Sequence, residues 1–134
     1  YEFSASIEEG NMGGAIFAAF GVINPVPNRI VKNIFEGIPF FKRNAGKIKP
    51  GSLEFNALER MKKQILEQGG VPNSKILTGT SGVFEGKANV GSGVRIYYRR
   101  VADQDGKEVF EILASSTKKN QDKVIKKLRA EYGG

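Results

Sequence analysis

Two neighbouring segments of the chain have polar side chains at alternating positions, the spacing that places residues on one face of a β-strand. In the first segment these residues are Arg95, Tyr97 and Arg99, and in the second they are Glu111 and Ser115. Two guanidinium groups can bind one phosphate in bidentate fashion, and a carboxylate beside an arginine stays ionised and can accept a proton. A tyrosine can stack on a base or donate its phenol proton. Together these groups could cleave a phosphodiester bond without a metal ion.

The pairing register of the two segments decides whether these side chains meet. Residues 103–107 connect them, and a three-residue loop would put Gly106 in the left-handed conformation that this loop type needs. In that register Arg99 faces Glu111 and Arg95 faces Ser115. We predict this register, which gathers the candidate site on one sheet face.

A two-residue turn at Asp105-Gly106 is the alternative. It would pair Arg100 with Glu111 and mix charged with aliphatic side chains on both faces, which is unfavourable for burial. The three-residue loop instead places Arg100 on the opposite, apolar face, across from Phe110. An ordinary cross-strand ion pair between Arg99 and Glu111 would contribute only ~0.2–1 kcal/mol. The pair alone therefore does not distinguish a functional site from a routine sheet surface.

The composition limits the chemistry that the chain can perform. Its 134 residues include 21 Lys and Arg against 14 Asp and Glu, a formal charge of +7 that favours an acidic partner such as nucleic acid. The absence of Cys and His excludes disulfides, thiolate metal sites, cysteine nucleophiles and histidine acid–base catalysis. With no Trp, base stacking would require Tyr or Phe. We expect an activity that needs neither a metal ion nor a cofactor.

The helices that would position these residues follow from apolar spacing and capping residues. Ser52 can cap a helix that Gly69-Gly70 ends. Its apolar positions repeat at helical spacing: Phe55, Leu58, Met61 and Ile65. A basic helix is expected over 118–132, and its buried positions are Val124, Ile125, Leu128 and Tyr132.

Strands are expected between these two helices. The ranges 75–78 and 83–87 are short candidates, and 94–101 and 108–115 are rich in β-branched and aromatic residues. The fold class that results is α+β, with N-terminal helices, a four-stranded antiparallel sheet and a basic C-terminal helix.

Residues 1–51 differ from the rest and are rich in Gly, Phe, Ile and Pro. The range 12–20 predicts a short apolar helix, and the run 12–23 is too short to span a bilayer, so no stable membrane insertion is expected. Asn28 could cap a second helix that Pro39 ends. Its apolar stripe would be Ile30, Val31, Ile34, Phe35 and Ile38. We predict a supporting or delivery segment over 1–51 and the functional domain over 52–134.

Further polar residues flank the predicted site. Lys118 and Lys119 begin the last helix, where they oppose the helix dipole unless an anion docks on the free backbone N–H groups. Capping of that helix by Thr117 is the simpler interpretation. Lys87 could assist a leaving group. The candidates for contacting RNA are Thr78, Thr80, Ser115, Thr117, Lys118, Lys119 and Asn120.

Two other functions fit parts of the sequence. Glu85-Gly86-Lys87 is a Glu-x-Lys triplet of the kind found in metal-dependent DNases, but those sites need a second carboxylate upstream on a neighbouring strand. A non-enzymatic nucleic-acid-binding module would also explain the positive charge.

The C-terminal 40 residues resemble a known group of toxins. The segments Val94-Arg-Ile-Tyr-Tyr-Arg-Arg-Val, Glu108-Val-Phe-Glu-Ile-Leu-Ala and Lys118-Lys-Asn-Gln-Asp-Lys-Val-Ile-Lys-Lys-Leu look like the last part of RelE-type ribonuclease toxins, and more broadly of the barnase/EndoU/colicin/RelE group. Several members of that group use a catalytic His, which this chain lacks. The resemblance therefore implies the His-free route, in which basic side chains stabilise the charge of the transition state.

The resemblance also implies a biological setting. The chain is similar to the C-terminal toxin of contact-dependent growth inhibition and related polymorphic toxin systems. Such a domain belongs to a larger secreted or cell-surface protein and acts in the cytoplasm of a target bacterium. Its expected partners are RNA, often transfer RNA, and a dedicated immunity protein; some such toxins also use elongation factor Tu. The expected reaction is attack of a ribose 2′-hydroxyl on the adjacent phosphate, with Glu111 as base, Arg95 and Arg99 stabilising the phosphorane, and Tyr97 or Lys87 assisting the leaving group.

Overall fold

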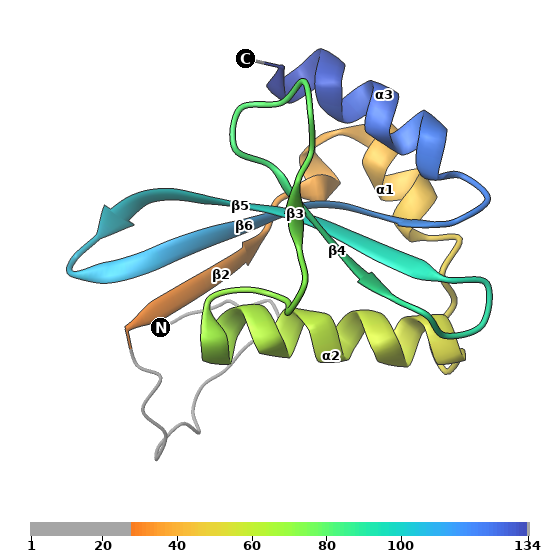
Figure 1. The fold of residues 1–134 in the computed structure, drawn as a ribbon, viewed down its shortest axis with the longest axis horizontal. Helices are drawn as coiled ribbons and strands as arrows, with labels where there is room; N and C mark the ends of the chain where they lie inside the picture. Colours follow the sequence, from red (N-terminus) through yellow and green to blue (C-terminus); the bar gives the residue numbers. More distant parts are fainter. Residues whose placement is uncertain (1–27, 134) are drawn as a thin grey trace.

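The computed structural model describes residues 28–133, which form a five-stranded mixed sheet with helices on both faces (Figure 1). In chain order the elements are β2 (Arg29–Asn33), the short 3-10 helix η1 (Phe35–Gly37), α1 (Pro39–Ala45), α2 (Leu53–Gln68), β3 (Lys75–Ile76), β4 (Phe84–Ala88), β5 (Val94–Gln104), β6 (Lys107–Thr117) and α3 (Gln121–Tyr132). The strand order is β2-β6-β5-β4-β3, with β2 parallel to β6 and the other pairs antiparallel. The α+β class is as predicted, but the sheet has a fifth, parallel strand.

The helix α2 forms as its capping residues predict. The Ser52 hydroxyl accepts a hydrogen bond from the Phe55 backbone N–H at 3.0 Å, and Gly69 ends the helix with a φ of 83°. The residues Ala57, Leu58, Met61 and Ile65 are buried against one face of the sheet. The apolar spacing in this segment therefore identified the correct buried side.

The predicted helix from Asn28 to Ile38 is wrong. Residues 29–33 form β2, whose backbone pairs with β6, and Pro39 begins the helix α1 instead of ending one. The β-branched pair Ile30-Val31 suits a strand, and Pro is favourable at the first position of a helix because its missing N–H is not needed there. The apolar spacing of this segment is compatible with both structures, and pairing with a distant strand decided between them.

Residues before 51 share a core with those after it. Phe41 of α1 is fully buried beside Tyr97 and Leu113, and Ile48 packs with the apolar residues of α2. The boundary predicted between 51 and 52 therefore does not separate two folding units within the described residues. The predicted helix over 12–20 lies outside them.

The β5–β6 hairpin has a two-residue turn at Asp105-Gly106, the alternative to the predicted three-residue loop. Gln104 pairs with Lys107, and Asp105 and Gly106 have φ values of 53° and 77°. Both residues have positive φ, as a type I′ turn requires and as the Asp-Gly dipeptide favours. The predicted three-residue loop is therefore wrong.

A β-bulge nevertheless restores the predicted pairing beyond the turn. Between the Gln104–Lys107 and Val101–Val109 pairs, β5 contains one residue more than β6. Arg99 consequently faces Glu111, and Arg100 faces Phe110, as predicted. The physical reason is burial, because this register keeps the apolar side chains of both strands on the same face.

A second bulge shifts the register back. Tyr98 pairs with Ile112 but Tyr97 pairs with Ala114, so that β6 has the extra residue here. Arg95 therefore faces Ser116 instead of the predicted Ser115. Ser115 moves to the opposite face of the sheet, where it is buried and cannot belong to the predicted site.

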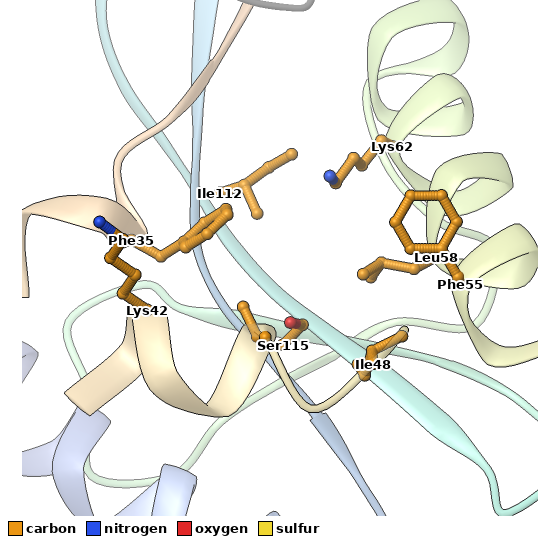
Figure 2. A pocket seen from close by; sticks show the side chains of 10 residues that line it. Phe35, Lys42, Ile48, Phe55, Leu58, Lys62, Ile112 and Ser115 are labelled. Atoms are coloured by element: carbon orange, nitrogen blue, oxygen red, sulfur yellow. The ribbon is translucent and has the colours of Figure 1, made fainter. Parts of the chain in front are cut away.

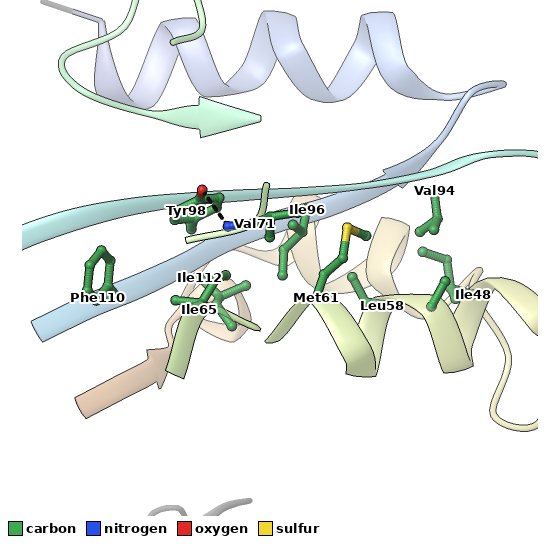
Figure 3. Close-up of a cluster of buried hydrophobic side chains, with 11 residues drawn as sticks. Ile48, Leu58, Met61, Ile65, Val71, Val94, Ile96, Tyr98, Phe110 and Ile112 are labelled. Carbon is green, nitrogen blue, oxygen red and sulfur yellow. Dashed lines mark hydrogen bonds between the residues drawn. The ribbon is translucent and has the colours of Figure 1, made fainter. Parts of the chain in front are cut away.

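A tyrosine hydroxyl ties the loop after α2 to the sheet on the α2 face (Figure 3). The Tyr98 hydroxyl accepts a hydrogen bond from the Val71 backbone N–H at 3.1 Å and lies 2.6 Å from the Ser74 hydroxyl. Its ring stacks on Phe84 with centroids 5.6 Å apart. The loop is therefore held by a buried polar contact as well as by apolar packing.

We predict that Tyr98→Phe lowers the free energy of unfolding by about 1–3 kcal/mol, because it leaves the buried Val71 N–H without an acceptor. Urea unfolding of the two proteins measures the difference. Ser74→Ala is the control and should cost less, since the Val71 bond survives. Equal stability of Tyr98→Phe and wild type would show that the hydroxyl does not anchor the loop.

Candidate active site

The polar face predicted from the sequence exists, but the structure divides it into two parts. Arg95, Tyr97 and Arg99 of β5 lie on the face covered by α1 and α3, as Figure 1 shows for the layers. Glu111 of β6 is on the same face, opposite Arg99. Arg95 and Arg99 are four residues apart, a separation of about 13 Å along a strand. The two arginines belong to different ends of the face.

The first part is the ion pair of Arg99 and Glu111. Both Nε and Nη2 of Arg99 contact Oε1 of Glu111, at 3.0 and 2.9 Å. The side chains are 29% and 19% exposed, so the pair is partly shielded but open to solvent. No hydrogen bond from residues 28–133 reaches the second oxygen, Oε2. Among the described residues, this oxygen therefore has no partner.

The C-terminal helix covers the Arg99–Glu111 pair with an aromatic ring. The guanidinium carbon of Arg99 lies 4.7 Å from the centroid of the Tyr132 ring, a cation–π contact. Burial raises the pKa of the Tyr132 phenol, with a smaller opposing effect from Arg99. The Tyr132 phenol is therefore protonated and lies beside the Arg99–Glu111 pair. It was predicted only as a buried helix position.

A lysine from β2 joins the same part of the face. Lys32 is the register neighbour of Glu111 across the β2–β6 pairing and is exposed. Its Nζ lies 3.4 Å from Oε1 of Gln104. Sequence reasoning missed this residue because its segment was predicted to be helical. The β-branched residues beside it, Ile30 and Val31, were the available signal for a strand.

The second part is a buried polar network between the sheet and α3. Tyr97 is fully buried and donates a hydrogen bond to Oε2 of Glu85 at 2.8 Å, and its hydroxyl is 3.2 Å from that of Ser116. Gln121 donates to the same Glu85 oxygen at 2.9 Å. Burial and the bond to Glu85 raise the pKa of Tyr97, so the phenol stays protonated. The ring does not reach solvent, so the predicted stacking of Tyr97 on a base is not available.

Arg95 lies at the end of this part of the face that is distant from Arg99. The residue is 6% exposed, and its Nε and Nη1 are buried with no hydrogen bond within the described part of the chain. Its guanidinium lies against Gly93, before the start of β5, and therefore points away from Arg99. Lys87 is its register neighbour on β4 and is exposed. Arg95 and Arg99 do not converge on one phosphate.

The predicted threonines of the β3–β4 loop lie near the other end of α3. The carbonyl of Thr78 accepts a hydrogen bond from Nε of Arg129 at 2.7 Å, and the Thr80 hydroxyl donates to the Leu77 carbonyl at 2.6 Å. The next residue, Ser81, donates its N–H to the carbonyl of Tyr132 at 2.8 Å. This loop therefore borders the Arg99–Glu111 pair and not Arg95.

Hydrogen bonds hold the residues before α3 to one another and to α1. Oδ1 of Asn120 accepts hydrogen bonds from the N–H and hydroxyl of Thr117, at 2.8 and 3.0 Å. Its Nδ2 donates to Asn44 of α1 at 2.8 Å, in a buried contact. Thr117 therefore does not cap α3, and Asn120 makes no side-chain cap bond to the helix. Lys118 and Lys119 are exposed at this turn.

The metal-dependent alternative gains no support from the geometry. Within residues 28–133, no group of three or more acidic side chains is placed to hold a metal ion. Glu85 of the Glu-x-Lys triplet is buried and bonded to Tyr97 and Gln121, while Lys87 is exposed. Among residues 28–84, no carboxylate completes such a cluster with Glu85.

A separate apolar cavity lies on the opposite face of the sheet (Figure 2). It has a volume of about 290 Å³ and lies between α1, α2 and the sheet. Its walls include Phe35, Phe55 and Ile112, with Ser115 at one side and Lys42 and Lys62 as the charged residues. The predicted catalytic residues Glu111, Arg99, Arg95, Tyr97 and Lys87 are not among its lining residues.

No known protein family, curated protein or solved structure matches the chain. None of the helices in the described residues is both long and apolar enough to cross a membrane.

We predict that Glu85→Ala destabilises the fold by about 1–3 kcal/mol, because it removes the acceptor of two donors in a buried site, Tyr97 and Gln121. Glu85→Gln keeps an acceptor oxygen and should lose less. Thermal or urea unfolding of both variants provides the comparison. Two variants as stable as wild type would argue that Glu85 has no structural role and return it to the list of candidate ligands.

Proposed function

We propose that this chain is a metal-independent endoribonuclease, the toxic domain of a larger bacterial protein. The observation that carries the proposal is the Arg99–Glu111 pair on a basic protein with formal charge +7. One oxygen of Glu111 is held by Arg99 and the other is unbonded within the described residues, on a partly open surface. A carboxylate with one oxygen bonded to an arginine and the other open to a ligand can act as a general base.

The chemistry that these groups support is transfer of the phosphate to the neighbouring ribose hydroxyl. Oε2 of Glu111 accepts the proton of a ribose 2′-hydroxyl as its oxygen bonds to phosphorus. The Arg99 guanidinium stabilises the additional negative charge of the phosphorane. The bond from phosphorus to the 5′ oxygen then breaks, and that oxygen takes up a proton. The products carry a 2′,3′-cyclic phosphate and a 5′-hydroxyl.

The leaving group needs a proton donor near this pair. Tyr97 is buried, and Lys87 is the register neighbour of Arg95, at the other end of the face. Tyr132 is protonated and touches Arg99, and Lys32 is beside Glu111 in the sheet. We therefore favour Tyr132 or Lys32 as the group that protonates the 5′ oxygen.

The substrate and partners of this proposal come from charge and from the resemblance. A positively charged domain attracts a polyanion, and the 2′-hydroxyl requirement selects RNA over DNA. Transfer RNA is the expected substrate, with elongation factor Tu as a further partner. A toxin domain of this kind also needs an immunity protein, which should be acidic in order to neutralise the basic face. Its proposed route is from a secreted or cell-surface protein to the cytoplasm of a target bacterium.

We predict that Glu111→Gln and Arg99→Ala each reduce RNA cleavage by a factor of ~100 or more while the protein still folds, the usual effect of losing a general base or a charge-stabilising group. The measurement is cleavage of total transfer RNA by purified variants at one salt concentration, because phosphate contacts depend on salt.

Arg100→Ala is the matched control for these variants. Arg100 has the same charge and is adjacent in sequence, but it lies on the opposite face and pairs with Asp103 and Glu108. Its loss should leave most of the activity. If Arg100→Ala were inactive and Arg99→Ala active, the reaction would have to be placed on the other face of the sheet.

We further predict that cleavage is insensitive to a chelator and leaves 2′,3′-cyclic phosphate ends. The expected reaction needs only side-chain groups, so EDTA should change the rate less than twofold, well below the ~100-fold effects above. Enzymatic end-labelling with and without prior removal of the cyclic phosphate identifies the ends. Complete loss of cleavage in EDTA that Mg²⁺ restores, or products with 3′-hydroxyl ends, would reject this mechanism. No cleavage of any RNA would favour a non-enzymatic binding module.

A further inference from the structure

Arg95 carries a buried charge that no described residue neutralises. The residue is 6% exposed, and its Nε and Nη1 have no hydrogen-bond partner within residues 28–133. No carboxylate in this part of the chain forms an ion pair with it. An unpaired charge in a protein interior is strongly unfavourable, and unsatisfied guanidinium N–H groups add to the cost. Such a group is expected to have a partner, and residues 28–133 do not supply one.

The surroundings of Arg95 favour an anion. The guanidinium lies against the turn that precedes β5, where Gly93 has a φ of 81° and a Cβ would stand only 3.1 Å from Nη1. The carbonyl of Gly93 accepts a hydrogen bond from the N–H of Lys118, which joins this turn to the start of α3. Lys87 is the register neighbour of Arg95 on β4. Two exposed lysines therefore accompany the buried guanidinium.

The start of α3 adds backbone donors to this region. Asn120 precedes the helix but makes no side-chain cap bond. The Gln121 N–H donates to the Lys118 carbonyl at 3.5 Å, and the N–H groups that follow it in the first turn keep their capacity to bind an anion. Two carboxylates of this region have hydrogen-bond partners: Glu85 accepts from Tyr97 and Gln121, and Glu54 accepts from the N–H and hydroxyl of Ser92 in the turn before β5. Asp122 is exposed in the first turn of α3. The balance of charge at this end of the face remains positive.

The geometry points to a phosphate-binding subsite formed by Arg95 with Lys87, Lys118 and the start of α3. This inference rests on the proposed function, because the phosphate is taken to belong to the RNA strand. Arg95 is about 13 Å from Arg99 along β5, so it contacts a different phosphate from the one that is cleaved. Arg95 thus positions the substrate, and Arg99 acts at the reacting phosphate. Free phosphate has the same chemistry, and the experiment below separates the two sources.

The first measurement uses inorganic phosphate and needs no cleavage. A ligand that binds only the folded protein raises its Tm, and the rise follows a saturating dependence on ligand concentration. Wild type and the surface control Arg100→Gln should show this rise, and Arg95→Met should lack it. A non-specific effect of phosphate on stability would grow without saturation and equally in all three proteins, and that result would overturn the inference.

The folding of Arg95→Met is itself informative. Removal of a buried, unpaired charge should leave the Tm in phosphate-free buffer unchanged or higher. A large loss of Tm would mean that Arg95 is a structural residue, contrary to the proposal. Arg95→Lys provides a second variant: it keeps the charge without the planar fork, and its phosphate affinity should fall at least several-fold.

The second measurement uses a single-stranded DNA oligonucleotide, which lacks the 2′-hydroxyl and cannot be cleaved by the proposed route. Arg95→Met should weaken its binding about tenfold, as loss of a charge-assisted phosphate contact does. The slope of log affinity against log salt should fall in magnitude by about 0.7, the contribution of one phosphate contact on a single strand. Arg100→Gln should change neither quantity. Unchanged oligonucleotide binding in Arg95→Met, with phosphate binding lost, would assign the site to free phosphate and overturn the RNA subsite.

These two measurements stand apart from the proposed nuclease activity. If wild type bound phosphate and oligonucleotide through Arg95 but cleaved no RNA, the ribonuclease proposal would fail and the binding site would stand. If wild type cleaved RNA but Arg95→Met bound both probes like wild type, the subsite would fail and the ribonuclease proposal would stand.

Discussion

The pairing of β5 with β6 is the constraint on which the rest of this structure depends. The hairpin begins at a type I′ turn, which on its own would place Arg100 opposite Glu111. One bulge shifts the register to pair Arg99 with Glu111, and a second bulge, in the other strand, shifts it back. A slip of one residue exchanges the two faces of a strand, so these opposed bulges determine which side chains are buried and which can meet a ligand.

The register also determines how α3 is attached, and through α3 it shapes the candidate site. Tyr97 and Glu85 face each other across β5 and β4, and together they hold Gln121 at the first residue of α3. At the last residue of the same helix, Tyr132 covers Arg99. A buried polar network at one end of the helix therefore helps to position the aromatic ring at the other. Tyr97 therefore has a structural role, although its residue type suggested a role in catalysis.

Arg95 and Arg99 lie on the same face of β5, and they show how differently a protein can treat the same charge. Arg99 is paired with Glu111, stacked on the Tyr132 ring and partly exposed to solvent. This arrangement costs little free energy of folding, and it leaves one oxygen of Glu111 without a partner among the described residues. Arg95 is buried and unpaired within the described residues, which lowers stability unless a ligand neutralises it. Natural proteins accept such losses of stability where a function requires them. One face of the sheet thus combines a partly exposed ion pair with a buried arginine that has no partner among the described residues.

Local signals in the sequence were sufficient for the elements that depend on near neighbours. The Ser52 cap and Gly69 end define α2, and alternation along 94–101 correctly places Arg95, Tyr97 and Arg99 on one face. The features that depended on distant partners were decided only by the tertiary structure. The apolar spacing of 28–38 suited a helix as well as a strand, and only pairing with β6 made residues 29–33 a strand. The bulges likewise arise from burial of both faces at once, which no single segment specifies. The second bulge places Ser116, instead of the predicted Ser115, opposite Arg95.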